Sequence, residues 1–209
     1  QVAKAAKELK RDMETDLLSN VAKSAGSATA ARKLGGCPTW YETNVDAGAG
    51  GSGAGNGAIR TDGTQRAFTE DQLKGILVSC YNEGGNPNMI MVNAFNKQKL
   101  SGFTGGSTRF DAAEDRRLIT SIDVYESDFG TMQVSPNRFI RGANGTAAKI
   151  GQDAHILDME YWAVSFLRDF ALQTPAQTAD ADQRFMVAEY TLESRNEKAS
   201  GLITDLTTS

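Results

Sequence analysis

Residues 184–206 constrain the fold of this chain most, because apolar and polar side chains alternate along their first half. The apolar or aromatic members of the pattern are Met186, Ala188, Tyr190 and Leu192. The polar members between them are Glu189, Thr191 and Glu193. A period of two is typical of a strand with one buried face. After a polar connector at residues 194–198, residues 201–206 resume the apolar pattern, so we predict two paired strands.

A helix at the start of the chain is the expected packing partner of these strands, since an isolated hairpin is marginal in water. Residues 1–24 carry apolar side chains at steps of three and four, which form one stripe on a helix. The stripe consists of Val2, Ala5, Leu9, Met13, Leu17 and Val21. We predict that this helix ends near Gly26 and that residues 27–36 add a short Ala-rich helical turn. Because helical composition begins at Gln1 without an N-cap, we interpret the chain as a fragment or a matured product.

Composition restricts the class of function. The chain has 209 residues, which suits one large domain or two small ones. A formal net charge of −4 disfavours a protein whose whole surface binds nucleic acid. No apolar run approaches the ~18 residues that span a bilayer. Cys37 and Cys80 are far apart in the sequence and form no zinc or redox motif, so we interpret them as reduced thiols.

The middle of the chain alternates helical and strand patterns, which indicates an α+β fold. Thr69 and Gln72 have the spacing of a capping box at the start of a helix. The expected buried stripe of this helix is Leu73, Ile76, Leu77, Cys80 and Tyr81. Residues 89–92 are continuously apolar and predict a strand buried on both faces, and residues 93–100 predict a second helix that ends at Gly102.

Further strands are predicted in the second half of the chain. Residues 118–125 and 132–134 are expected to pair, with a turn at residues 127–130. Residues 156–159 predict a short strand that residues 162–170 continue. The fold class predicted from these patterns is therefore α+β with small sheets.

A glycine-rich stretch at residues 47–57 has almost nothing to bury, so we expect it to be flexible or to take its shape from a neighbour. Within it, residues 48–53 match the pattern G-x-G-x-x-G. A dinucleotide site also needs a strand before the motif and a helix that opens within it. Because more glycine follows in place of a helix, we favour a loop between subunits over a phosphate site.

The other candidate residues favour structural roles. His155 is the only histidine and has no second His or Cys close to it in the sequence, so we expect a polar residue at a strand edge. Asp180 and Asp182 are expected in a solvated loop in preference to a metal site. The charged run at residues 114–117 predicts a solvated turn, with an ion pair between subunits as the alternative. The sequon at Asn144 has no role outside a secretory pathway.

Three aromatic residues are interpreted as core or interface anchors, because large rings with a polar edge suit both places. They are Trp40, Tyr161 and Trp162. With no constellation of nucleophile, base or ligand groups in the sequence, we predict no catalytic residue, no cofactor-binding residue and no metal ligand.

Several blocks, in their order and spacing, resemble the major capsid proteins of tailed phages, in the subfamily with the Hong Kong 97-type fold. The blocks are residues 82–87 leading into 89–94, residues 123–130 leading to 136–139, and residues 189–192 preceding 195–199. The resemblance covers about residues 1–30 and 69–206. It implies a long spine helix, a peripheral β-structure and a compact axial domain.

The resemblance also implies a division of the chain. Residues 1–68, with the spine helix at 1–24, would form the first part of the peripheral domain. Residues 69–180 would form the axial domain, and residues 181–209 would return to the peripheral domain. The N-terminal arm and extended loop of the family have no counterpart in this sequence.

The function implied by the resemblance is that of a structural protein of the virion, not an enzyme. Subunits would assemble in the host bacterial cytoplasm into hexamers and pentamers of an icosahedral shell around double-stranded DNA, without sequence-specific binding. A scaffolding protein, a maturation protease and a portal would be partners, and no cofactor or membrane is implied. The alternatives are a capsid-like shell of a cellular nanocompartment, and a nucleotide-binding enzyme that uses residues 48–53.

Overall fold

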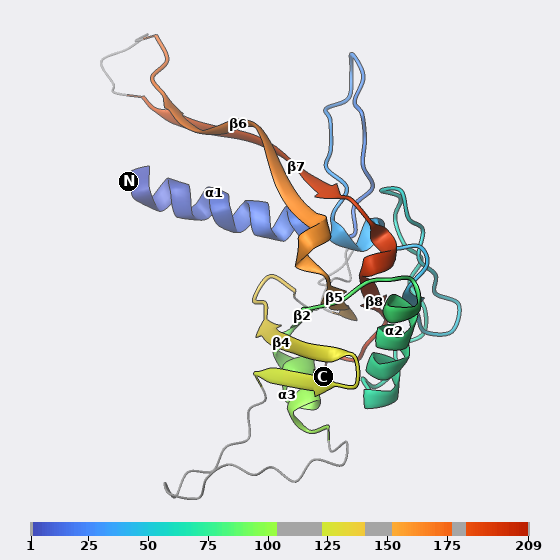
Figure 1. The fold of residues 1–209 in the computed structure, drawn as a ribbon. Helices are drawn as coiled ribbons and strands as arrows, with labels where there is room; N and C mark the ends of the chain where they lie inside the picture. Colours follow the sequence, from blue (N-terminus) through green and yellow to red (C-terminus); the bar gives the residue numbers. More distant parts are fainter. Residues whose placement is uncertain (1, 104–122, 141–151, 177–182, 209) are drawn as a thin grey trace, which may run out of the picture.

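The computed structural model describes residues 2–103, 123–140, 152–176 and 183–208. It shows a compact body from which a helix and a long two-stranded ribbon project side by side (Figure 1). The body contains a six-stranded sheet of mixed direction, and helices pack against it, so the fold is α+β as predicted. The strand order in this sheet is β1-β8-β5-β2-β4-β3, and the separate ribbon pairs β6 with β7.

The projecting helix α1 spans Val2–Leu17 and is shorter than the predicted helix over residues 1–24. At its end the Ser19 hydroxyl donates to the Asp16 carbonyl oxygen at 2.8 Å, and the buried Asn20 side chain, beyond the helix, binds the backbone of Arg60. The predicted end at Gly26 is therefore wrong, and so is the helical turn at residues 27–36. Gly26 instead lies in a loop, residues 24–33, whose ends are joined by an antiparallel bridge between Ser24 and Lys33.

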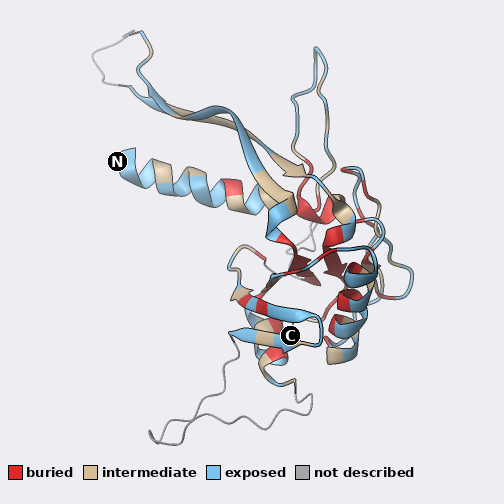
Figure 2. Cartoon of the chain, viewed as in Figure 1, coloured by how far each residue is buried: buried red, intermediate tan, exposed pale blue. Residues whose placement is uncertain are grey.

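The six-stranded sheet has apolar side chains on both faces. One cluster packs under the helices and includes Leu73, Ile76, Ile90, Val92, Ile156 and Ile203. The other face carries Cys37, Tyr41, Leu157 and Leu202. Strand β2, Met89–Val92, alternates between the two clusters, and Ile90 and Val92 are fully buried. Buried residues therefore concentrate in the body, whereas the projecting elements are mostly exposed (Figure 2).

The two helices of the body confirm the local predictions. Helix α2, Glu70–Asn82, starts with the complete capping box of Thr69 and Gln72. Helix α3, Ala94–Ser101, is capped by the Asn93 side chain and ends at Gly102. Tyr81 is the exception in the predicted stripe of α2, because 59% of it is exposed. Its ring packs on Phe129 at 4.8 Å between centroids, at the turn of the next hairpin.

The hairpin at the other end of the sheet is formed by β3, Val124–Ser127, and β4, Gly130–Pro136. Ser127 pairs with Gly130, so the predicted turn at residues 127–130 is confirmed. The predicted strand residues 118–122 lie outside the described part of the chain. Strand β5, Ala154–Leu157, is fully buried between β8 and β2, two residues earlier than the predicted strand at 156–159.

The predicted pairing of the last two strands is wrong. Strand β7, Phe185–Ser194, pairs with β6, Trp162–Gln173, and forms the ribbon. Strand β8, Gly201–Ile203, enters the central sheet between β5 and β1, which spans Val45–Asp46. The reason is burial on both faces: Leu202 lies in one core cluster and Ile203 in the other, which only an interior strand allows.

Candidate functional site

The projecting arm, defined as α1 with the β6–β7 ribbon, is the first candidate site. α1 lies along β7, as expected for the helix that opens the chain. The Tyr190 hydroxyl donates to the Asp16 carboxylate at 3.3 Å, and the Lys10 ammonium lies 5.7 Å from the centre of the Phe170 ring. Of the helix stripe, only Met13 is buried, while Leu9 and Leu17 are half-buried.

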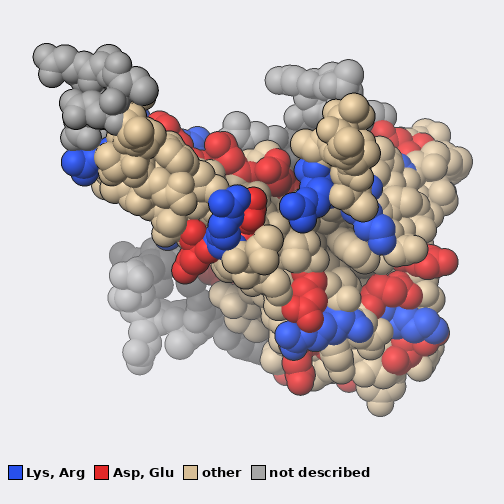
Figure 3. Space-filling model, turned by 90° about the horizontal axis from the view of Figure 1, so that it is seen from above, with Lys and Arg blue, Asp and Glu red and all other residues tan. Residues whose placement is uncertain are grey.

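Five large apolar side chains of the ribbon are more than a third exposed in the subunit. They are Val164, Phe166, Leu167, Leu172 and Phe185. Leu167 is the most exposed of them, at 75%. Seen from above, much of the surface of the arm is uncharged (Figure 3). Apolar surface concentrated on one projection is typical of a site that another protein chain covers.

Two irregularities bend the ribbon. The register shifts between Phe166 and Arg168 and again between Arg168 and Ala171, so each interval holds an extra residue of β6. Leu167 is the extra residue of the first bulge. Between the bulges, Arg168 forms a two-pronged ion pair with Glu189 across the strands. Bulges re-aim side chains, and here the bulge presents Leu167 to solvent.

The base of the ribbon is anchored by aromatic residues, as predicted for Trp162. Its indole N–H donates to the Ser200 hydroxyl at 2.9 Å, and its ring lies 5.6 Å from that of the fully buried Tyr41. The carbonyl oxygen of Tyr161 accepts from the Arg195 N–H at 2.9 Å. Trp40 lies apart from this group, donates to the Gly35 carbonyl oxygen and lies under the Lys23 ammonium.

The glycine-rich loop wraps around a carboxylate of its own chain. The N–H groups of Gly48 and Gly63 each donate to the Asp205 carboxylate at 2.9 Å, and the Thr204 hydroxyl donates to it at the same distance. The N–H group that a bound phosphate would need from Gly48 is therefore already used. A Cβ at Gly48 would lie 2.1 Å from the Thr64 carbonyl oxygen, so the glycine permits close backbone packing.

Of the two expectations for residues 47–57, the structure favours a shape set by neighbouring segments, here those of the same chain. The stretch is held to the body by further backbone bonds, from the Gly55 N–H to Tyr41 and from the Gly57 N–H to Thr39. It takes its shape from its own subunit, and no helix opens between it and Glu70. The G-x-G-x-x-G pattern thus lacks the strand–turn–helix context of a dinucleotide site.

Behind this loop lies a buried ionic centre, which we define as Arg60, Asp62, Asp153 and Asp205. The Arg60 guanidinium lies 2.7 Å from Asp153, 2.9 Å from Asp62 and 3.5 Å from Asp205. Arg60, Asp153 and Asp205 have fully buried side chains. The centre joins the glycine-rich segment to the start of β5 and the residues after β8. Sequence reasoning missed it because its members are far apart along the chain.

The carboxylates of this centre titrate differently. Burial raises the pKa of Asp153 to about 7; Arg60 opposes this shift and Asp205 adds to it. The Asp153 Oδ2 atom is buried without a hydrogen-bond partner among the described residues. Burial also acts to raise the pKa of Asp205, but the N–H groups of Gly63 and Gly48, with Thr204 and Arg60, outweigh it and hold that pKa below its ordinary value.

His155 lies close to this centre, in the interior of the sheet and not at the predicted strand edge. Its Nδ1 atom is 3.5 Å from the Tyr41 hydroxyl and 3.8 Å from the Cys37 sulfur. Burial lowers the pKa of His155 to about 3, with a contribution from Arg60, and burial raises the pKa of Cys37 to about 12. A neutral imidazole beside a neutral thiol lacks the thiolate that a cysteine nucleophile needs.

We predict that Asp153→Asn makes the subunit more resistant to heat at pH 8 than the wild type. The folded state binds the Asp153 proton with a pKa of about 7, against an ordinary value of 3.8, so this group's stabilising contribution is largest near pH 4 and is lost as pH rises through about 7. Asparagine stays neutral at every pH. The gain in Tm should therefore shrink as pH falls from 8 to 5.

Thermal melts of Asp153→Asn from pH 5 to 8 are compared with those of the wild type and of Asp62→Asn. His155 contributes the opposite slope below pH 6.5, because the unfolded state gains its proton first, but this slope is common to both proteins. Asp62→Asn is the matched control, since Asp62 contacts Arg60 with a side chain that is 29% exposed. A Tm difference between Asp153→Asn and wild type that is constant with pH would contradict the assignment.

The remaining predicted residues are not brought into these sites. Asp180 and Asp182, residues 114–117 and Asn144 lie outside the described residues. Across the described ranges, no three His, Cys, Asp or Glu side chains are arranged to hold a metal ion. None of the helices in the described part of the chain combines the length and apolarity that crossing a membrane requires.

A compact body, a projecting arm and exposed apolar side chains on that arm are typical of a structural subunit that is completed by other chains. A family model for the SU10 major capsid protein matches residues 1–207. The chain therefore belongs to the SU10 major capsid protein family, which gives it a structural role in a phage capsid and a place in the virion. None of the curated proteins compared with the chain matches it.

Proposed function

We propose that this capsid protein forms hexamers and pentamers of an icosahedral shell with the Hong Kong 97-type architecture. In this proposal α1 is the spine helix, and the β6–β7 ribbon beside it is the peripheral β-structure. The six-stranded sheet with α2 and α3 is the axial domain. The observation that carries the proposal is the arm: a member of a capsid family exposes Phe166, Leu167 and Leu172 on a ribbon that leaves the body.

The two parts of the subunit then take different contacts. The arm would bind neighbouring capsomers, and the body would carry contacts within a capsomer. The domain boundaries at residues 1–68, 69–180 and 181–209 remain a proposal, and the pairing of β6 with β7 places residues of the second and third segments side by side in the arm.

The contents and partners of the shell are also proposals. Family membership favours a phage genome over the enzyme cargo of a nanocompartment. We propose assembly in the host bacterial cytoplasm, with a scaffolding protein, a maturation protease and a portal as partners. The role is structural, and we propose no catalytic residue and no cofactor.

Leu167→Asp should abolish shell formation and leave the fold intact. Leu167 is mostly exposed in the isolated subunit, and exposed substitutions usually change the free energy of unfolding by less than about 0.5 kcal/mol. In an assembled interface the same change would bury an unpaired charge. Sedimentation velocity would measure assembly, and thermal melting of unassembled subunits would measure folding.

Leu167→Met is the matched control, because it keeps an apolar side chain of similar volume at the same bulge. We expect it to assemble like the wild type. If Leu167→Asp assembled equally well, the ribbon bulge would not be a contact between subunits, and the proposal for the arm would fail.

A further inference from the structure

We infer that α1 presents an exposed basic stripe to double-stranded DNA inside the shell and that this stripe contacts its phosphates. The basic stripe is Lys4, Lys7 and Arg11, at spacings of three and four residues along one side of the helix. All three are exposed. The inference rests on the proposed function, in which the shell encloses DNA.

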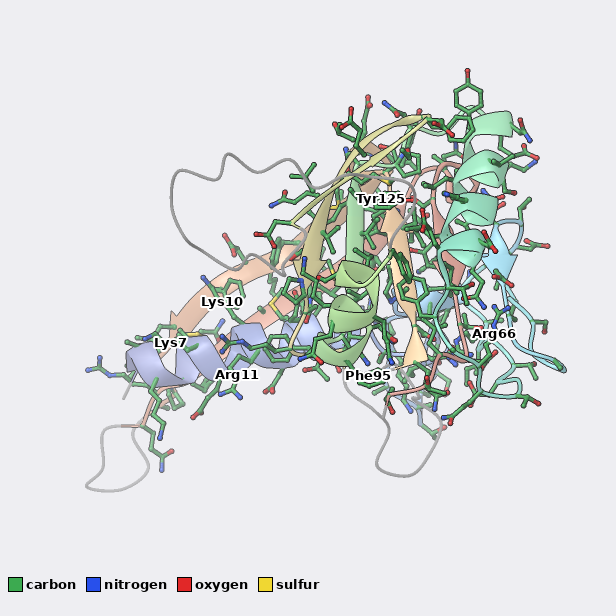
Figure 4. All side chains as sticks on the ribbon, turned by 90° about the horizontal axis from the view of Figure 1, so that it is seen from below. Lys7, Lys10, Arg11, Arg66, Phe95 and Tyr125 are labelled. Carbon is green, nitrogen blue, oxygen red and sulfur yellow. The ribbon has the colours of Figure 1, made fainter. Side chains whose placement is uncertain are left out.

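The stripe lies on the side of α1 opposite the ribbon. Met13, the buried residue of α1, and Asp16, which accepts from Tyr190 of β7, define the side that faces the ribbon. The helix lies in front of the ribbon when the molecule is seen from below, and Lys7 and Arg11 lie on it there, whereas Lys10 lies over the Phe170 ring of β6 (Figure 4). The surface that carries the stripe is thus separate from the apolar side chains proposed to contact other subunits.

The charge of α1 is divided along its length. Residues 2–11 contain four basic residues and one acidic residue, Glu8, whereas residues 12–17 contain three acidic residues and no basic residue. Two residues of the acidic half make hydrogen bonds within the subunit, since Glu14 accepts from the Asn137 side chain and Asp16 accepts from the Tyr190 hydroxyl. The outer half therefore keeps a positive charge although the chain as a whole carries −4.

Little within the subunit neutralises this charge. Glu8 approaches Lys4 at 3.9 Å in an exposed pair, which is worth little in water. Lys7 and Arg11 have no ion-pair partner among the described residues. A linear row of cations that is left open by its own chain matches a polyanion better than a single anion.

The dimensions suit duplex DNA. Seven residues of helix extend over about 10 Å, and duplex DNA carries one negative charge per ~1.7 Å of its axis. Phosphate contacts carry no sequence information, so a row of them would hold the duplex without selecting its sequence. Weak contacts from each subunit, repeated over a shell, would line the packaged DNA without binding any one site tightly.

The test compares Lys7→Gln/Arg11→Gln with Arg32→Gln/Lys33→Gln. Each variant removes one Lys and one Arg charge from exposed positions, and the second pair lies in the loop of residues 24–33 that the Ser24–Lys33 bridge closes. The measurement is the binding of a fluorescent 30-bp duplex of random sequence to unassembled full-length subunits across a salt series. Thermal melting checks that each variant is folded.

We expect the slope of log affinity against log salt to fall by about 2 in the α1 variant and to stay at the wild-type value in the control, because each lost phosphate contact removes about 0.9 from the slope. Equal slopes in all three proteins, equal losses in both variants, or no duplex binding by wild type at 50 mM salt would each overturn the inference.

Electron microscopy of the same proteins under assembly conditions separates this inference from the proposed function. A second copy of the chain is the competing occupant of the stripe. If the α1 variant no longer forms shells while its duplex binding is unchanged, a second copy of the chain occupies the stripe, and the inference is overturned. Shells from the α1 variant with a wild-type slope would overturn it while supporting the proposed function. A wild type that forms no shells would count against the proposed function alone.

Discussion

Replacing Arg60 with methionine is expected to destabilise the subunit by about 3–5 kcal/mol, the largest loss that we predict. The substitution removes the guanidinium that lies 2.7 Å from Asp153 and 3.5 Å from Asp205, both of which are buried. Asp205 would remain charged in the interior without its cation. Methionine can replace the aliphatic part of the side chain, so the effect reports mainly on charge. Urea unfolding followed by tryptophan fluorescence measures it.

Arg66→Met provides the control for Arg60→Met. Arg66 pairs with Asp46 at 2.7 Å, but both side chains are about a quarter to a third exposed. Pairs of this kind usually contribute about 1 kcal/mol or less. Equal losses in the two variants would show that the buried ionic centre is not a special support of the fold.

Gly48→Ala is expected to destabilise the subunit by about 3 kcal/mol, at the upper end of the range for overpacking. The new methyl group would lie 2.1 Å from the Thr64 carbonyl oxygen. The backbone on both sides of this contact is held in place, because the N–H groups of Gly48 and Gly63 both donate to Asp205. Relief requires the loop to move away from the Asp205 carboxylate, which would break the hydrogen bond to the residue 48 N–H. Urea unfolding measures the change.

Gly75→Ala should have the opposite sign and serves as the reference for Gly48→Ala. Gly75 lies inside α2, and a Cβ there would meet nothing within 4 Å. Alanine in a helix interior is favoured over glycine by about 0.5–1 kcal/mol. If Gly48→Ala were as well tolerated as Gly75→Ala, the close packing of the glycine-rich loop would be wrong.

Local signals explain which elements could be predicted from the sequence. The capping box of Thr69 and Gln72, the cap at Asn93 and the turn before Gly130 each depend on a few neighbouring residues, and the structure confirms all three. The alternation around Tyr190 correctly indicated a strand. The partner of that strand could not be read locally, because residues 201–203 and 162–173 both had suitable patterns.

Long-range contacts explain what the sequence did not predict. Just beyond the early end of the first helix, Asn20 binds the backbone of Arg60, forty residues away. The ionic centre joins Arg60 to Asp153 and Asp205, and Cys37 meets His155 across a similar separation. In each case the residues are ordinary by themselves, and only the assembled sheet brings them together.

The arm was predicted in part. The apolar stripe of α1 followed from its periodicity, and its contact with β7 followed from the need of a strand pair for a packing partner. The exposure of Leu167 did not, because residues 162–170 were predicted only as the continuation of a short strand. The first register shift in β6 makes Leu167 an extra residue that is exposed, and bulges leave no clear signal in a single sequence.

Cryo-electron microscopy of particles made by the complete gene product, expressed with the scaffolding protein and protease proposed as its partners, tests the central claim most directly. We predict closed shells of hexamers and pentamers in which α1 and the β6–β7 ribbon lie at the contacts between neighbouring capsomers. Leu167 should be buried there. A protein that remained monomeric with those partners supplied, or a shell in which the ribbon touched no other subunit, would contradict this account.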